Sequence, residues 1–217
     1  MGEAKRRKET GAPPPQKGKS NKLLYAGIGL LALAAVLLGV FFLTAPPKPT
    51  SDGLPVAAPN AEDFPAQLDQ FGVSVGPEDA PVVVREFADY QCPACGNFAS
   101  ASKQLKEEYV AEGKVRFVYF DLPLQQHQNA MPAAQAARCA GDQDAYWAMH
   151  ERLYDSQTEW SGSNDPVATF TRYAGDLGLE ERRFRRCMTT ELHREAVEQS
   201  RQVAMQLRVT STPTVLV

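Results

Sequence analysis

The sequence predicts an α/β domain with a helical insertion, preceded by a transmembrane helix and a linker. Two strand-like apolar runs flank a helix-like run that begins at a Cys-x-x-Cys motif. Sequence with helical periodicity then fills residues 125–208, and strand-like sequence returns only at residues 212–217. Strands that alternate with helices in this order are typical of an α/β fold.

The N-terminus predicts a signal anchor. Residues 1–22 carry seven Lys or Arg against two Glu, and residues 23–43 follow as 21 residues without a charge. This length suits a bilayer core, and cations before the span keep a disordered tail in the cytoplasm and export the rest. A cleavable signal peptide is the alternative, but its apolar core should be shorter, and prolines crowd the candidate site after Ala45. We therefore predict single-pass anchoring in the cell membrane.

A linker and one folded domain follow the anchor. Residues 44–60 contain five prolines and predict a semi-rigid spacer. Residues 61–217 form the predicted domain, and the acidic balance of this part disfavours nucleic acid as a partner, because phosphate binding needs basic residues.

The domain divides into elements with distinct periodicities. Strands are predicted at residues 71–75, 82–87 and 114–120, and a helix runs from Cys95 towards Gly113. Asp165 predicts a helix cap with Pro166 in the first helical position. Further helices are predicted at residues 129–141, 144–157, 180–188 and 191–207. The chain ends four residues after Pro213, so we expect the C-terminal end of the fold to be missing.

The Cys92-Pro-Ala-Cys95 motif has the pattern of a dithiol that cycles. Cys92 would lie at a helix N-terminus, where unpaired N–H groups and the helix dipole stabilise an exposed thiolate. Cys95 would lie one turn inside, shielded, where it can resolve a mixed disulfide.

Three other uses of the motif are disfavoured. A zinc site needs four ligands, usually as two close pairs, whereas Cys139 and Cys187 follow singly and no histidine pairs with them at ligand spacing. A structural Cys92–Cys95 disulfide would close too small a loop to stabilise the fold much. Haem attachment would need histidine where the chain has Gly96. We therefore expect redox exchange without a metal or a cofactor.

The chain resembles the DsbA-like branch of the thioredoxin-fold thiol–disulfide oxidoreductases. The resemblance covers residues 71–217 and rests on four segments in matching order: VVVREFADYQCPACGNF, RFVYFDLPL, AAQAARCAGDQDAYWAMHERLY and VTSTPTVLV. It implies a thioredoxin-like fold whose helical insertion lies between the second central strand and the cis-proline strand. It also implies a membrane-anchored disulfide bond formation protein with Cys92 as nucleophile and Cys95 as resolving thiol.

The resemblance extends to the surroundings of the motif. Pro213 matches the cis-proline that faces the active-site disulfide and holds substrate, with Thr212 alongside; the alternative is a strand-initiating proline. Glu86 matches the buried acid that relays the proton of the resolving thiol, a task that a carboxyl with a raised pKa suits. Alternatively, Glu86 reaches solvent or pairs with Arg85.

The other cysteines are expected to pair. Export into oxidising surroundings and similar paired cysteines in the resembling proteins favour a structural Cys139–Cys187 disulfide over two buried free thiols. Such a bridge would close a long loop and stabilise the fold by about 4 kcal/mol. His127, His150 and His193 are expected to be surface or packing residues.

These inferences favour an oxidase that introduces disulfides into exported proteins with free thiols. The resemblance implies a quinone-linked membrane oxidoreductase, DsbB-like or vitamin K epoxide reductase-like, as redox partner. A reductase or isomerase on the same fold is the alternative, separated from the oxidase by its reduction potential. A third hypothesis is a non-catalytic chaperone that binds peptides. It predicts that Cys92→Ser leaves function intact.

Overall fold

A computed structural model describes residues 22–44 and 64–217, which fall into two units, Met1–Ala61 and Glu62–Val217. The predicted tail and linker lie almost entirely outside the described residues. In the first unit, helix α2 (Lys22–Thr44) spans the predicted anchor. Within the described ranges, no helix meets the length and hydropathy that crossing a membrane requires.

The second unit is built on a four-stranded sheet. Its strands are β1 (Val73–Val75), β2 (Val82–Ala88), β3 (Val115–Asp121) and β4 (Thr214–Leu216), in the order β1-β3-β2-β4. β2 and β3 run parallel in the centre, while β1 and β4 are antiparallel edges. The predicted first strand begins two residues late, because a 3-10 helix, η1 (Ala66–Phe71), precedes it.

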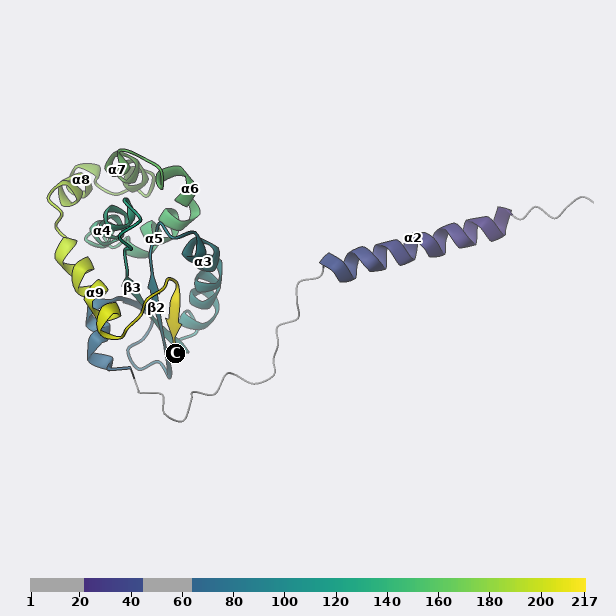
Figure 1. Ribbon diagram of the computed structural model, residues 1–217, viewed down its shortest axis with the longest axis horizontal. Helices are drawn as coiled ribbons and strands as arrows, with labels where there is room; N and C mark the ends of the chain where they lie inside the picture. Colours follow the sequence, from purple (N-terminus) through teal and green to yellow (C-terminus); the bar gives the residue numbers. More distant parts are fainter. Residues whose placement is uncertain (1–21, 45–63) are drawn as a thin grey trace, which may run out of the picture. The chain divides into compact units, whose positions relative to one another are not determined.

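Helices cover the sheet and extend beyond one end of it. α3 (Pro93–Leu105), continued by the π-helix η2 (Lys106–Val110), connects β2 to β3. The insertion contains α4 (Ala130–Gly141), α5 (Tyr146–Asp155), α6 (Gln157–Trp160), α7 (Pro166–Asp176), α8 (Glu181–Thr189) and α9 (Arg194–Gln206). Figure 1 shows α4 to α8 grouped at one end of the strands, with α3 and α9 on opposite sides.

Alternation along β3 divides the core into two layers. Phe117 and Tyr119 pack in the cluster that includes the α4 alanines, whereas Val118 and Phe120 pack with α9 residues on the other face. This is the period-2 pattern of a strand buried on both faces. α3 therefore rests on one face of the sheet and α9 on the other.

A disulfide crosses the insertion. Cys139 of α4 and Cys187 of α8 are bonded, with their Cα atoms 5.9 Å apart. The alternative of two free thiols at these positions is therefore wrong. The cap predicted for α7 is also present, because Asp165 Oδ1 accepts a hydrogen bond from the Ala168 amide at 3.1 Å, with Pro166 as the first helical residue.

Candidate active site

Cys92 occupies the N-cap position of α3, directly after the turn that leaves β2. Its backbone is extended, and Pro93 is the first helical residue, where a missing N–H costs no hydrogen bond. The turn is closed by Asp89, whose carbonyl accepts from the Cys92 amide at 3.1 Å and whose Oδ1 accepts from the Gln91 amide at 2.7 Å. The sequence places the cysteine at the helix end because Pro93 disfavours helix before it.

The two sulfurs differ in exposure. Cys92 is 9% exposed and Cys95 is fully buried, and both are free thiols. Cys92 is thus less open than predicted, because the loop with the cis Thr212–Pro213 peptide lies against it, with Cys92 Sγ 3.7 Å from the Thr212 carbonyl oxygen. The Cys95 sulfur accepts a hydrogen bond from the Asp89 amide at 3.5 Å.

The environment moves the two thiol pKa values in opposite directions. Burial alone would raise the pKa of Cys92, but the neighbouring Thr212 side chain and the Cys95 and Ala94 amides outweigh it and lower the pKa. Burial raises the pKa of Cys95 to about 12. Cys92 is therefore the sulfur that ionises, and Cys95 is the one that stays protonated.

Thr212 is placed to act on this ionisation. Its hydroxyl is buried and has no hydrogen-bond partner among the described residues. A thiolate at Cys92 would supply the missing acceptor, since a buried hydroxyl without a partner is costly. The residue before cis-Pro213 thus favours the charged form of the nucleophile.

Glu86 lies on the face of β2 that packs against α3. It is 1% exposed and accepts a hydrogen bond from Ser102 of α3. Burial raises its pKa from 4.5 to about 7. Arg85, on the opposite face, pairs with Asp69 at 2.7 Å, so the alternatives of an Arg85–Glu86 pair and of solvent exposure are wrong.

No hydrogen bond joins Glu86 to either active-site cysteine within the described part of the chain. Glu86 instead borders a largely apolar cavity of about 280 Å³, whose walls include Phe98, Ser102 and Val215.

Sequence reasoning missed Asp89 as a site residue. Its carboxylate is buried, and Oδ2 accepts from the Leu124 amide at 2.8 Å and lies 2.8 Å from His127 Nδ1. His127, expected to be a surface or packing residue, therefore contacts the side chain that shapes the cysteine turn. The sequence shows Asp89 three residues before Cys92, but it does not show which residues its carboxylate contacts.

Residues of the helical insertion form hydrogen bonds with the same turn. Gln157 Nε2 donates to the carbonyls of Tyr90 and Cys92, at 2.7 and 2.9 Å. Gln91 accepts from the Asn129 amide at 2.7 Å and donates to the Ser161 carbonyl at 2.8 Å. The helical insertion thus holds the backbone on which the nucleophile sits.

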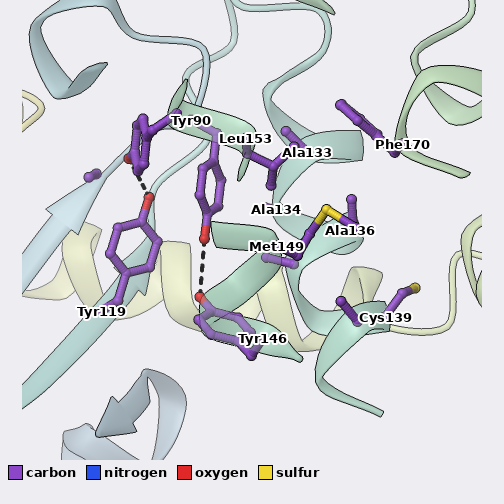
Figure 2. Packing of buried hydrophobic residues seen from close by; sticks show 14 of the residues in the cluster. Tyr90, Tyr119, Ala133, Ala134, Ala136, Cys139, Tyr146, Met149, Leu153 and Phe170 are labelled. Atoms are coloured by element: carbon purple, nitrogen blue, oxygen red, sulfur yellow. Dashed lines mark hydrogen bonds between the residues drawn. The ribbon is translucent and has the colours of Figure 1, made fainter. Parts of the chain in front are cut away.

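A buried cluster of phenols and one imidazole lies behind the turn. The Tyr90 hydroxyl lies 2.8 Å from His150 Nδ1 and 3.3 Å from the Tyr146 hydroxyl, and Figure 2 shows Tyr90 and Tyr146 among the surrounding core residues. Burial lowers the pKa of His150 well below its ordinary value, so the ring is neutral. His150 was expected to be a surface or packing residue, and with 3% of it exposed it packs in the core.

Comparison with known proteins places these features in a family. A family model described as Thioredoxin matches residues 69–217, which include every residue of the site described above. The probable disulfide bond formation protein D of Bacillus anthracis is 26% identical over 204 residues, covering 91% of this chain and 88% of that protein.

Two further matches differ in the share of each protein that they cover. The crystal structure of oxidised BdbD from Bacillus subtilis superposes with a TM-score of 0.60 at 24% identity, covering 68% of this chain and 81% of that one, which shows a shared fold. The Na(+)/H(+) antiporter NhaA 3 of Salinispora tropica is 37% identical over 143 residues, 65% of this chain. This chain spans only 21% of that antiporter.

Proposed function

The chain belongs to the thioredoxin family, and from that premise we propose that it is an extracytoplasmic thiol–disulfide oxidoreductase that oxidises thiols of exported proteins. The observation that carries this proposal is the split between the lowered pKa of Cys92 and the pKa of about 12 of Cys95. A stabilised Cys92 thiolate favours the reduced pair and so makes the disulfide form a stronger oxidant. Relatives whose name is disulfide bond formation protein support the same activity.

The reaction follows from the two sulfurs. A client thiolate attacks Cys92 of the Cys92–Cys95 disulfide, and Cys95 leaves and takes up a proton. A second client thiolate then attacks the client sulfur of the mixed disulfide, and Cys92 leaves as a thiolate. The client loses two electrons and two protons, and the pair gains the electrons. A leaving group with a low pKa speeds the second step.

The neighbouring residues have proposed roles in these steps. Glu86, whose pKa is about 7, exchanges the proton of Cys95 by way of an intervening water. Thr212 and Pro213 lie beside Cys92 and hold the client backbone next to the reacting sulfur, with Thr212 also stabilising the thiolate.

The reduction potential tests the direction of electron flow. Equilibration of the Cys92/Cys95 pair in glutathione buffers should give a potential clearly above the roughly −270 mV of thioredoxin. A potential near that value contradicts the oxidase and identifies a reductase. Isomerase activity is read separately, as repair of a client with scrambled disulfides.

A substitution tests catalysis itself. Cys92→Ser should abolish disulfide formation in a reduced model protein, whereas Ser100→Ala, an exposed serine of α3, should leave it intact. If Cys92→Ser still supports disulfide formation, the protein assists its clients by peptide binding and the enzymatic proposal is wrong.

Location and recycling belong to the same proposal. The basic residues 1–22 and the uncharged residues 23–43 support a single-pass anchor with a cytoplasmic N-terminus. The full chain should stay in membranes after alkaline extraction, and added protease should digest the domain only from the extracytoplasmic side. Release by alkali contradicts the anchor. A quinone-linked membrane oxidoreductase is the proposed partner that reoxidises Cys92 and Cys95, and its addition with quinone should restore turnover.

A further inference from the structure

Four potential metal ligands converge at the Cys139–Cys187 disulfide. One ligand atom each from Cys139, Cys187 and His193 lies within 4.8 Å of the others. Asp142 completes the group, because its Oδ2 is 2.9 Å from His193 Nε2 and 3.7 Å from the sulfur of Cys187. No sequence spacing predicts this cluster, since the turn between α8 and α9 brings His193 back to the disulfide.

The four residues come from separate, packed elements. Cys139 lies in α4 and Asp142 is the residue that follows that helix, Cys187 lies in α8, and His193 is the N-cap of α9. α4 packs against both α8 and α9, so the ligands are held together by more than the disulfide alone. The cysteines are buried, while the side chains of His193 and Asp142 are 23% and 32% exposed, which provides a path from solvent.

In the oxidised protein this group cannot bind a metal tightly. Sulfurs bonded to each other are not thiolates, and thiolates are the form that binds zinc. Reduction changes the donor set to two thiols, one imidazole and one carboxylate. Two thiolates with imidazole and carboxylate are ligands that Zn²⁺ accepts in tetrahedral geometry, with ligand atoms about 3.3–3.8 Å apart.

We propose that the Cys139–Cys187 disulfide covers a redox-gated zinc site formed by Cys139, Cys187, His193 and Asp142. A dithiol reductant transfers two electrons and two protons to the disulfide; the reductant becomes a disulfide, and Cys139 and Cys187 become thiols. Zn²⁺ then binds and displaces the two thiol protons to solvent. A metal link replaces the covalent link between α4 and α8.

The site is separate from Cys92 and Cys95 and does not depend on the proposed function. The test must therefore remove the other dithiol. The full chain carrying Cys92→Ser and Cys95→Ser is reduced with a phosphine, which becomes a phosphine oxide by taking oxygen from water. The phosphine is then removed under anaerobic conditions. The protein is titrated with Zn²⁺ and, separately, with Co²⁺.

The reduced protein should bind one equivalent of Zn²⁺, and bound Co²⁺ should show the visible bands of a tetrahedral thiolate site. The oxidised protein should bind neither metal there. Zn²⁺ should also raise the thermal midpoint of the reduced protein, since a ligand that binds only the folded state stabilises it. If reduction unfolds the domain, Zn²⁺ should restore its far-ultraviolet circular dichroism.

Matched variants assign the ligands. His193→Ala and Asp142→Asn should each weaken zinc binding at least about tenfold, whereas Asp144→Asn removes the same charge from an exposed position two residues away and should change nothing. The proposal is overturned if the reduced chain binds no equivalent of zinc, if zinc fails to stabilise or refold it, or if both ligand variants bind zinc as tightly as the parent.

Discussion

The sulfur of Cys92 lies 3.7 Å from the carbonyl oxygen of Thr212, a residue 120 positions further along the chain. This contact joins the first turn of α3 to the loop that enters β4. It explains why the nucleophile is largely covered, and it places the Thr212 hydroxyl, which has no hydrogen-bond partner in the described part of the structure, beside the sulfurs. Thr212 thus both covers Cys92 and favours its thiolate.

Thr212→Val should raise the pKa of Cys92, because valine keeps the shape of threonine and removes the hydroxyl that stabilises the thiolate. The rise follows from the loss of one hydrogen-bond donor to a charged group. The ultraviolet absorbance of the thiolate, followed against pH, measures it. Thr210→Val, at an exposed position, is the control and should leave the titration unchanged. An unshifted Cys92 titration in Thr212→Val would show that the backbone amides alone set the pKa.

Glu86→Gln should stabilise the protein at pH 8 and have much less effect at pH 4.5. The carboxyl titrates at about 7 in the fold and at 4.5 as its ordinary value, so the folded state binds the extra proton between these values. Wild-type stability therefore falls as pH rises through this window, by about 3 kcal/mol, and glutamine does not share that loss.

Urea unfolding at several pH values measures the difference between wild type and Glu86→Gln. Glu107→Gln, on the exposed face of η2, removes a carboxylate without burial and should stay within about 0.5 kcal/mol of wild type throughout. A Glu86→Gln difference that does not change with pH would mean that burial does not oppose ionisation of this carboxyl.

Gln157→Ala should loosen the start of α3. Its side chain donates to the carbonyls of Tyr90 and Cys92, and its loss leaves both without that donor, at a cost of about 1–2 kcal/mol. The Gly96 amide, which donates to the Cys92 carbonyl at 3.0 Å, should then exchange with deuterium faster. Gln104→Ala removes an exposed glutamine of the same helix and should leave Gly96 unaffected. Equal Gly96 exchange in both variants contradicts this role for the insertion.

The central strands and the position of the cysteine pair could be predicted from sequence because their signals are local. Residues 82–88 and 115–121 are rich in apolar and β-branched residues, and Pro93 marks the first helical residue after Cys92. The 3-10 helix of residues 66–71 was missed because six residues are too short to show a period.

The surroundings of the cysteines could not be predicted because their contacts are distant in sequence. Gln157 reaches carbonyls 65 and 67 residues away, and Asp89 meets His127 across 38 residues. The direction of Glu86 depended on the partner of Arg85, which is Asp69 on the other face of the sheet. Hydrogen bonds of this kind leave no periodic pattern, so only the fold reveals them.

His150→Gln should make the protein less sensitive to acid. His150 is neutral in the fold because burial lowers its pKa well below 6.5, while the unfolded chain takes up a proton near 6.5. Wild type therefore keeps this contribution above pH 6.5 and loses it as pH falls below that value, by about 2 kcal/mol at pH 5. The glutamine of the variant has no such titration, and its amide oxygen can still accept from the Tyr90 hydroxyl.

The free energies of unfolding of wild type and His150→Gln, measured at pH 7.5 and at pH 5, test this prediction. The variant should be less stable than wild type at pH 7.5, and the difference between the two proteins should be smaller at pH 5. Gln104→Ala, at an exposed position without a titratable group, should keep the wild-type difference between the two pH values within about 0.5 kcal/mol. A gap between wild type and His150→Gln that is the same at both pH values would show that folding does not lower the pKa of His150.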